Sequence, residues 1–396
     1  MTMYRIVETY LFDTCTLKCG YCWLAESGKV LDSSQLKPFR DPQYIDQVTG
    51  FFNRRTSAAE KWHLQLTGGE PQLMPNFSRF CSNLFEVGNR VSLYTALIID
   101  RDHPSFRFLT SHAAPHFDYL MCSFHPEAEA HEEEYWRKVE ILKDAGHNVI
   151  VRFVGHPKRL HLLERLSKKC KELNLCFYPT TLFSKNYPGA YSDDEKTLLA
   201  GYFSSLSQTI QLAGGIDTTN TKCYAGNRII ATYLSSGDIW PCISVQKPLL
   251  GNVYQDRLEL MEGAIGCPKP GMACNCDVHF QQDIVIGTED SERFAGVKAG
   301  YTEPMTVAEQ NQLCEERELH FSAAPKGIGS VEDDQTLIYS KAFVKSQLLK
   351  TISAASLNSV SSNGSETVTA AATAIAPAPV VATDKAWKKL MAFIGR

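Results

Sequence analysis

The stretch CTLKCGYC at residues 15–22 decides how the rest of the chain is interpreted. Its cysteines, Cys15, Cys19 and Cys22, have the spacing C-x3-C-x2-C, and the aromatic residue Tyr21 precedes the third. The stretch follows a β-rich segment at residues 4–12. Thiolates are the usual ligands of iron–sulfur clusters, and a cubane cluster needs four ligands. Three cysteines in one loop therefore predict a cubane with one iron left open, and an open metal position is where substrate or cofactor binds.

A structural zinc site and a disulfide are the two alternatives for these thiols. A structural zinc site takes four ligands, most often as two C-x2-C pairs, and no fourth Cys or His stands near the loop. A disulfide would leave one of the three thiols over. The spacing favours an iron–sulfur cluster over both.

The motif C-x3-C-x-aromatic-C after an N-terminal strand resembles that of the radical S-adenosylmethionine (SAM) superfamily. The resemblance implies that Cys15, Cys19 and Cys22 ligate a 4Fe-4S cluster and that Tyr21 lies near the adenine of SAM. It implies that the open iron binds the amino and carboxylate groups of SAM. An electron from the cluster then splits SAM, and the 5′-deoxyadenosyl radical abstracts a hydrogen atom from the substrate. An electron donor such as a flavodoxin or a ferredoxin is implied as a partner.

The composition and charge of the chain limit the classes of protein to which it can belong. The chain has 396 residues, of which 44% are hydrophobic and 21% charged, which is typical of a globular protein of two or more domains. A net charge of −4 gives no basic footprint for nucleic acid. We see no stretch of 18 apolar residues and no secretory signal, so we expect a cytoplasmic protein without a membrane span. In that compartment, clustered cysteines indicate metal binding.

Residues 4–183 alternate short β-rich runs with segments whose apolar residues recur at helical spacing. The predicted strands are 5–12, 62–66, 90–97, 119–124, 149–154 and 175–181, and the predicted helices are 42–54, 76–87, 132–145 and 160–173. Six βα repeats predict an α/β fold with a parallel sheet, either open or closed. The family resemblance implies a partial (β/α)6 TIM-like barrel, with its site at the C-terminal ends of the strands.

A glycine turn, Gly68-Gly69-Glu70, follows the second predicted strand. Glycines let the backbone approach a ligand closely, and Glu70 is suited to accept a hydrogen bond from an ammonium group. The alternative is an ordinary glycine turn. The turn resembles the family's GGE motif, which implies that these three residues contact the amino group of SAM.

Three more candidates lie at the ends of later strands. Ser123 and His125 share one face of an extended segment, where they are candidates to bind SAM or substrate, or else are a strand-end serine and a surface histidine. Arg152 is the one charge in an apolar run, and we expect it to pair with the SAM carboxylate or with a carboxylate such as Glu8. Cys122 should point to the opposite face from Ser123, away from the site.

A second cysteine group follows, with a hairpin predicted at 235–238 between two β-like runs. Its members are Cys223, Cys242, Cys267, Cys274 and Cys276. Ligand count alone does not separate a zinc site from an iron–sulfur cluster here. The spacing Cys223-x13-Gly-x4-Cys242 resembles the first half of the C-terminal SPASM signature of many radical SAM enzymes. The second half is missing, which favours the shortened "twitch" form with a single auxiliary 4Fe-4S cluster.

The expected domains are a barrel core at 1–190, a helical linker at 191–216, an auxiliary-cluster domain at 217–300, an extension at 301–354 and a tail at 355–396. The tail begins as a flexible linker rich in Ala, Ser, Thr and Pro. It ends with Trp387, Leu390, Met391 and Ile394 at helical spacing among lysines. That pattern predicts a short basic helix that docks on the protein itself, on a partner or on a membrane surface.

These features favour a radical SAM enzyme. Its expected reaction is an oxidation of a carbohydrate-like small molecule or a peptide, because an auxiliary cluster gives the second electron a destination. The early position of the cysteine loop leaves no room before it for a peptide-recognition domain, which favours a small or carbohydrate-like substrate, or a peptide delivered by a separate protein. Redox-neutral epimerisation and maturation of a ribosomal peptide are the alternatives. A non-catalytic iron–sulfur or zinc protein would leave the three-cysteine loop and the GGE turn unexplained.

Overall fold

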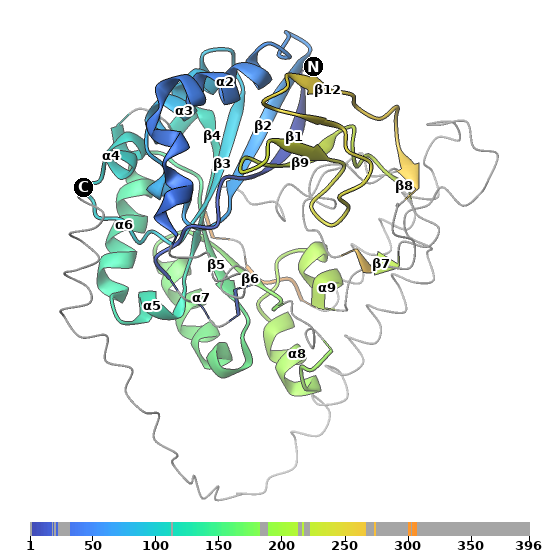
Figure 1. Cartoon of the computed structure of the whole chain (residues 1–396). Coiled ribbons are helices and arrows are strands. Elements are labelled where there is room, and N and C mark those ends of the chain that lie inside the picture. Colours follow the sequence, from blue (N-terminus) through green and yellow to red (C-terminus); the bar gives the residue numbers. More distant parts are fainter. Residues whose placement is uncertain are drawn as a thin grey trace, which may run out of the picture. The chain divides into compact units, whose positions relative to one another are not determined.

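A ten-stranded sheet runs through the described part of the chain (Figure 1). The computed structural model describes residues 2–17, 19, 21–22, 32–111, 114–182, 189–212, 216–217, 222–266, 273–274, 300–301 and 303–306. All of them lie in one compact unit, Met1–Ser356. The tail helix predicted around Trp387 and two cysteines of the second group, Cys267 and Cys276, lie outside the described residues.

Six parallel strands follow one another in chain order through the sheet, as the sequence predicts. They are β1 (Met3–Tyr10), β2 (Glu60–Thr67), β3 (Arg90–Thr95), β4 (Phe117–Ser123), β5 (Val149–Val154) and β6 (Cys176–Thr180). The full order, β12-β11-β10-β9-β1-β2-β3-β4-β5-β6, leaves β12 and β6 as edges. The α/β prediction of a partial barrel is therefore confirmed, and the sheet is open.

Helices α2 to α7 gather on one side of this sheet (Figure 1). They are α2 (Pro42–Asn53), α3 (Phe77–Phe85), α4 (Pro104–Ser111), α5 (Pro126–Glu129), α6 (Glu132–Asp144) and α7 (Leu163–Glu172), joined by the short 3-10 helices η1 (Ser33–Leu36), η2 (Pro38–Arg40), η3 (Pro71–Leu73), η4 (Ala114–His116) and η5 (Pro157–Leu162). Each of the four predicted helices overlaps one of these. Helix α8 (Asp193–Ala200) lies in the predicted helical linker and begins with three acidic residues and a capping box between Ser192 and Glu195. Helix α9 (Leu206–Leu212) follows it.

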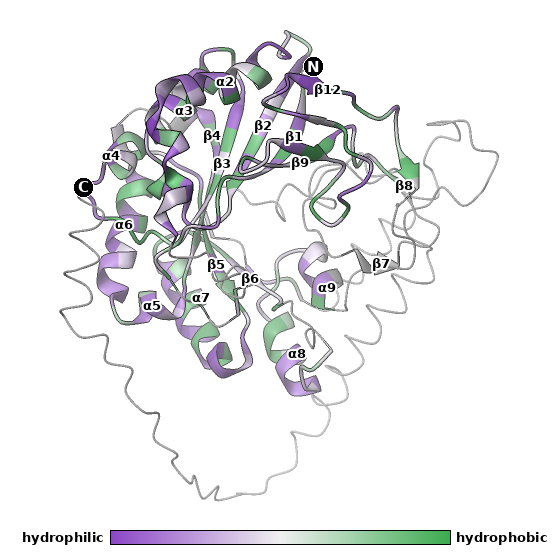
Figure 2. Cartoon of the chain, in the orientation of Figure 1, coloured by the Kyte–Doolittle hydropathy of each residue, from purple (hydrophilic) through white to green (hydrophobic). Residues whose placement is uncertain are grey.

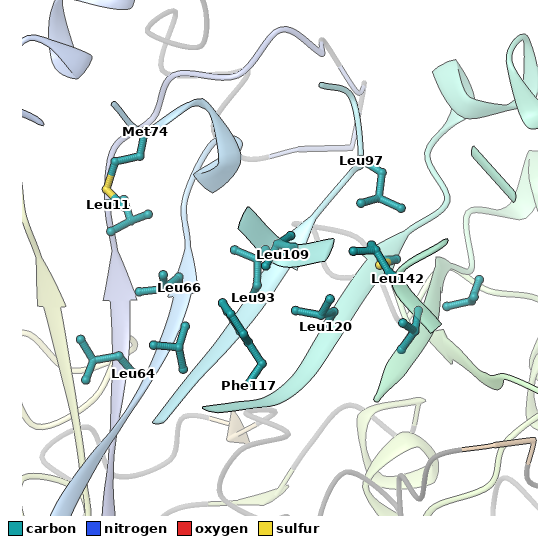
Figure 3. Packing of buried hydrophobic residues seen from close by; sticks show 14 of the residues in the cluster. Leu11, Leu64, Leu66, Met74, Leu93, Leu97, Leu109, Phe117, Leu120 and Leu142 are labelled. Atoms are coloured by element: carbon teal, nitrogen blue, oxygen red, sulfur yellow. The ribbon is translucent and has the colours of Figure 1, made fainter. Parts of the chain in front are cut away.

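The two faces of the sheet differ in chemistry because side chains alternate along each strand. On the helix side, Leu64, Leu93, Leu120 and Val151 are fully buried in the main core. Figure 3 shows this packing, with Leu109 of α4 and Leu142 of α6 against the strands. The other face carries a small core, formed by Tyr119, Met121, Ile150, Cys176 and Tyr178, and many polar groups. Figure 2 shows the same alternation of hydrophobic and hydrophilic residues along the strands.

The hairpin predicted at 235–238 is present and extends the sheet. Strand β9 (Ile229–Tyr233) pairs parallel with β1, and β10 (Asp238–Trp240) returns antiparallel to it. The turn contains Gly237 at φ +77°, a value that glycine adopts easily. Strands β11 (Gly251–Asn252) and β12 (Arg257–Leu258) complete this edge. The domain boundaries at 190, 216, 300 and 354 stay predictions.

Two short pairs lie outside the main sheet. Strand β7 (Ile216–Asp217) pairs with β14 (Ala273–Cys274), and β8 (Lys222–Cys223) pairs with β13 (Ile265–Gly266). Among the described residues, no helix has the length and apolar content needed to cross a bilayer.

A leucine of β4, an interior strand of the sheet, makes the packing testable. Leu120 is 0% exposed in β4, whereas Leu198 of α8 is 44% exposed. Because truncation in a close-packed core leaves a cavity, we expect Leu120→Ala to lower the free energy of unfolding by about 2–5 kcal/mol in urea titrations. Leu198→Ala is the matched control and should change it by less than about 0.5 kcal/mol. Equal losses in the two variants would contradict this core.

Candidate functional site

Main-chain hydrogen bonds tie the segment before the cysteine loop to the glycine turn. The amide of Leu11 donates to Thr67 O at 3.0 Å, that of Gly69 donates to Phe12 O at 2.7 Å, and that of Glu70 donates to Thr14 O at 2.9 Å. The chain leaving β1 therefore runs beside the turn that follows β2. This contact fixes where the cysteine loop begins, directly beside Gly68–Glu70.

Both glycines of the turn are required by this close approach. Gly68 has φ +130°, and a Cβ there would lie 2.4 Å from Phe12 O. A Cβ on Gly69 would lie 1.8 Å from Thr14 O. A side chain at either position would push the two backbones apart. The GGE pattern is thus explained within this chain by packing of the turn on the cysteine segment.

The Glu70 side chain lies in a buried polar network. One carboxylate oxygen accepts hydrogen bonds from Thr95 Oγ1 at 2.8 Å and from the Gln72 amide at 3.2 Å, and the other accepts from the Ala96 amide at 2.8 Å. Burial raises the pKa of Glu70 to about 7, although these hydrogen bonds and the charge of Lys138 oppose the shift. The carboxylate therefore joins the ends of β2 and β3. Contact of this turn with the amino group of SAM stays a prediction.

The three thiols of the loop lie near one another, with Cys19 buried and Cys15 and Cys22 half-buried. The Cys22 amide donates to Cys19 O at 2.9 Å, and the Leu17 amide donates to Cys15 Sγ at 3.4 Å. Burial, reinforced by the charge of Glu70, raises the pKa of Cys15 to about 12. Burial and then the charge of Glu127 hold the pKa of Cys19 well above its usual range, and Cys15 and Cys22 add to that shift.

This set of thiols fits a cluster better than a single metal ion. In the described residues, no three Cys, His, Asp or Glu side chains converge as one ion requires. A cubane places separate irons at its corners, so its thiolate ligands need not converge on one point. Ligation by Cys15, Cys19 and Cys22 stays a prediction.

The structure brings Ser123 and Arg152 together. They are register partners across β4 and β5, and Arg152 is in turn opposite Tyr178 of β6. All three lie on the sheet face away from the helices. Arg152 forms no ion pair with any described residue, its buried Nε has no hydrogen-bond partner, and its guanidinium lies 5.9 Å from the centre of the Tyr94 ring. The alternative ion pair between Arg152 and Glu8 is therefore not formed.

His125 contacts the cysteine loop. A hydrogen bond of 2.7 Å joins Tyr21 Oη to His125 Nδ1, and Cys19 Sγ lies 3.4 Å from the same nitrogen. The Tyr21 and His125 rings stack with centroids 6.0 Å apart. Burial, together with the charges of Arg152 and Arg159, lowers the pKa of His125 to about 3, so its imidazole is neutral. His125 is thus part of the loop's surroundings, which rules out the surface-histidine alternative.

Glu127 is a site residue that the sequence did not single out. Its Oε2 lies 3.6 Å from Cys19 Sγ, in the first turn of α5. The available signal was its position two residues after His125, just past the end of β4. Cys122 faces the helix-side core beside Leu120, as alternation predicts.

The second cysteine group is described in part. Cys223 is half-buried in β8, and Cys242 is buried just after β10. The backbone of Cys274 lies in β14. Ligation of a zinc ion or of an auxiliary cluster by this group stays a prediction.

No protein-family model matches the sequence, and no curated protein matches it. Several solved structures are similar. SuiB of Streptococcus suis bound to S-adenosylmethionine is 14% identical with a TM-score of 0.45, over 64% of this chain and 64% of SuiB. The anSMEcpe complex with AdoMet and Cp18Cys peptide is 14% identical with a TM-score of 0.46, over 91% of this chain and 99% of that one.

TYW1 with a lysine-pyruvate adduct is a third similar structure, 15% identical with a TM-score of 0.27, over 49% of this chain and 69% of TYW1. SuiB and anSMEcpe hold the cofactor that the cysteine motif implies. All three TM-scores are below 0.5, so these similarities assign neither a family nor an activity to this chain.

The glycine contact predicts the effect of one methyl group. Gly69→Ala places a Cβ against Thr14 O, and we expect it to lower the free energy of unfolding by about 1–3 kcal/mol. It should also reduce the iron bound after anaerobic reconstitution, because the cysteine loop is displaced. Gly201→Ala is the control, since its Cβ would meet nothing closer than 3.4 Å. Normal stability and iron content in Gly69→Ala would contradict the contact.

The shifted Glu70 carboxyl predicts a pH dependence of stability. Its pKa rises from 4.5 to about 7 on folding, so the folded state keeps a proton that the unfolded state has lost. The contribution of this carboxyl group to stability is therefore fully present below pH 4.5 and falls by about 3 kcal/mol as pH rises from 4.5 through 7. In urea titrations across this range, Glu70→Gln should flatten the profile, whereas exposed Glu86→Gln should not. An unchanged slope in Glu70→Gln would contradict a raised pKa.

Proposed function

We propose that this chain is a radical SAM enzyme that reductively cleaves S-adenosylmethionine and abstracts a hydrogen atom from its substrate. The observation that carries the proposal is the main-chain contact that holds the three-thiol loop beside the GGE turn. Both segments lie at the C-terminal ends of β1 and β2, where α/β barrels carry their sites. A non-catalytic cluster protein has no use for this pairing.

Cys15, Cys19 and Cys22 would hold the 4Fe-4S cluster. When bound, the cluster and SAM together supply the electron and the 5′-deoxyadenosyl group that start the radical chemistry. His125 and Glu127 limit how the loop moves, because both approach Cys19 Sγ. A partner such as a flavodoxin or a ferredoxin would deliver the electron.

Residues around the loop would hold SAM by complementary groups. The Glu70 carboxylate is engaged by β3, so the turn at Gly68–Glu70 would offer its main-chain carbonyls to the SAM ammonium. Arg152 suits the SAM carboxylate, because a guanidinium matches that group geometrically and its Nε has no other partner. Ser123 is beside it in register and adds a hydroxyl. Tyr21 of the loop stacks on His125, and the adenine would bind beside it.

The proposed outcome is an oxidation of a carbohydrate-like small molecule or a peptide. A second 4Fe-4S cluster on four of the thiols at Cys223, Cys242, Cys267, Cys274 and Cys276 would accept the second electron. An epimerase instead needs a thiol that returns a hydrogen atom to the substrate. Cys122 does not serve, because it is fully buried on the helix side of the sheet. That placement favours oxidation over an epimerisation using Cys122.

The proposal is tested by anaerobic reconstitution with iron and sulfide, reduction with dithionite and addition of SAM. We expect 5′-deoxyadenosine to form, and the triple variant Cys15→Ala, Cys19→Ala, Cys22→Ala to form none. About half of the iron should remain in that variant if the second group binds a cubane. Cys81→Ala, which removes a buried thiol of α3, is the control and should retain cleavage.

Two outcomes would contradict parts of this account. Iron-loaded protein that makes no 5′-deoxyadenosine would overturn the radical SAM function. Zinc with no residual iron in the triple variant would overturn the auxiliary cluster and leave the first claim intact.

A further inference from the structure

We propose that Glu8, Tyr10, Tyr233 and Trp240 form a subsite for the ammonium group of a substrate. The subsite lies on the polar face of the sheet, at the ends of β1 and β9. The term substrate rests on the proposed function, whereas ammonium binding by these residues does not.

Strand register brings the four side chains to one face. Glu8 is opposite Ala231 of β9, and Ala231 is opposite Trp240 of β10, so the three lie in one row. Residues directly opposite across paired strands share a face and lie close together. Ala231, which has a small side chain, lies between Glu8 and Trp240 in this row. Tyr10 and Tyr233 form the next pair along the same two strands.

The three aromatic rings pack on one another. Tyr10 and Tyr233 stack with centroids 4.7 Å apart and an angle of 13° between their planes. Trp240 meets Tyr233 nearly edge-on, at 5.1 Å and 71°. All three rings and Glu8 are half-buried, so each keeps some surface that a ligand can reach. The faces of Trp and Tyr rings attract cations, by about 0.5–2 kcal/mol each depending on desolvation.

The electrostatic surroundings favour a positive ligand. Burial, followed by the negative charges of Glu8 and Asp13, raises the pKa of Tyr233 to about 12. Glu8 is held in place by the Ile243 amide, which donates to its Oε2 at 3.4 Å. A carboxylate beside electron-rich rings is a combination that binds an ammonium group both by charge and through the π systems.

Gln65 extends the subsite on the other side of Glu8. The two residues are register partners, and Gln65 is 2% exposed. Its Nε2 is buried and has no hydrogen-bond partner in the described residues. Buried polar groups are almost always satisfied by protein, by ordered water or by a ligand, so an unpartnered amide beside Glu8 is a place where a ligand oxygen can accept a hydrogen bond. The ligand class is therefore an ammonium compound such as a lysyl residue or an amino sugar, with the Gln65 amide placed to donate to an oxygen elsewhere in the same substrate.

The position fits a substrate better than SAM itself. Alternation places Glu8 and Tyr10 on the same sheet face as Ser123 and Arg152, opposite the helix-side core that contains Val7. Three strands, β2, β3 and β4, separate β1 from Arg152 on β5. Tyr10 is also five residues before Cys15, so the subsite lies close to the start of the cysteine loop.

The test uses the full chain, reconstituted without oxygen and saturated with SAM, and isothermal titration calorimetry. The probes are Nα-acetyl-lysine N-methylamide and the uncharged Nα-acetyl-norleucine N-methylamide. We expect the lysine probe to bind about tenfold more tightly. Glu8→Gln and Trp240→Leu should each remove most of that preference. Glu60→Gln is the matched control, because it removes the same charge from the opposite end of the neighbouring strand, and it should retain the preference.

Each outcome decides the proposal. Equal affinity for the two probes, no binding of the lysine probe, or its displacement by SAM would overturn the subsite. Far-ultraviolet circular dichroism of each variant separates lost binding from lost folding, and the wild-type probe comparison needs no variant. Formation of 5′-deoxyadenosine without lysine preference would leave the proposed function standing and the subsite wrong. A preference for the lysine probe without formation of 5′-deoxyadenosine would leave the subsite standing and the proposed function wrong.

Discussion

Three main-chain hydrogen bonds between the end of β1 and the turn after β2 hold the candidate site together. They run from Leu11, Gly69 and Glu70 to Thr67, Phe12 and Thr14. They fix where the cysteine loop begins relative to the sheet, and contacts of Cys19 with His125 and Glu127 hold the loop further on. They require glycine at positions 68 and 69, and they bring Glu70 to where Thr95 and Ala96 anchor it. One contact therefore connects the cysteine motif, the glycine motif and the end of β3.

The sheet divides stability and function between its two faces. The helix side is apolar and fully buried, with residues such as Leu93 and Leu120 at its centre. The other side combines a small core that contains Met121 and Ile150 with tyrosines, Ser123 and Arg152. Polar groups on that face lower the packing energy available there, but they supply donors, charges and rings for ligands. Extension of the sheet by β9 and β10 enlarges this polar face beside the cysteine loop.

The sequence predicts the six parallel strands and four of the helices well, because alternation and helical spacing are local signals. It misses α4, whose eight residues give a weak pattern, and it misses the pairing of β9 with β1, which joins residues more than 200 apart. Motif spacing finds Cys15–Cys22 and Gly68–Glu70. It does not find Glu127 beside Cys19, or the anchoring of Glu70 by Thr95, because those contacts depend on how loops from different strands meet.

The central claim is that the loop at Cys15–Cys22 and the turn at Gly68–Glu70 form one site, where SAM binds to a cluster. Electron paramagnetic resonance tests it most directly, on reduced, reconstituted protein with Cys223 and Cys242 changed to Ala so that only the first cluster contributes. We predict that adding SAM changes the g-values of the cluster signal, because SAM becomes a ligand of the open iron. An identical spectrum with and without SAM would contradict the account.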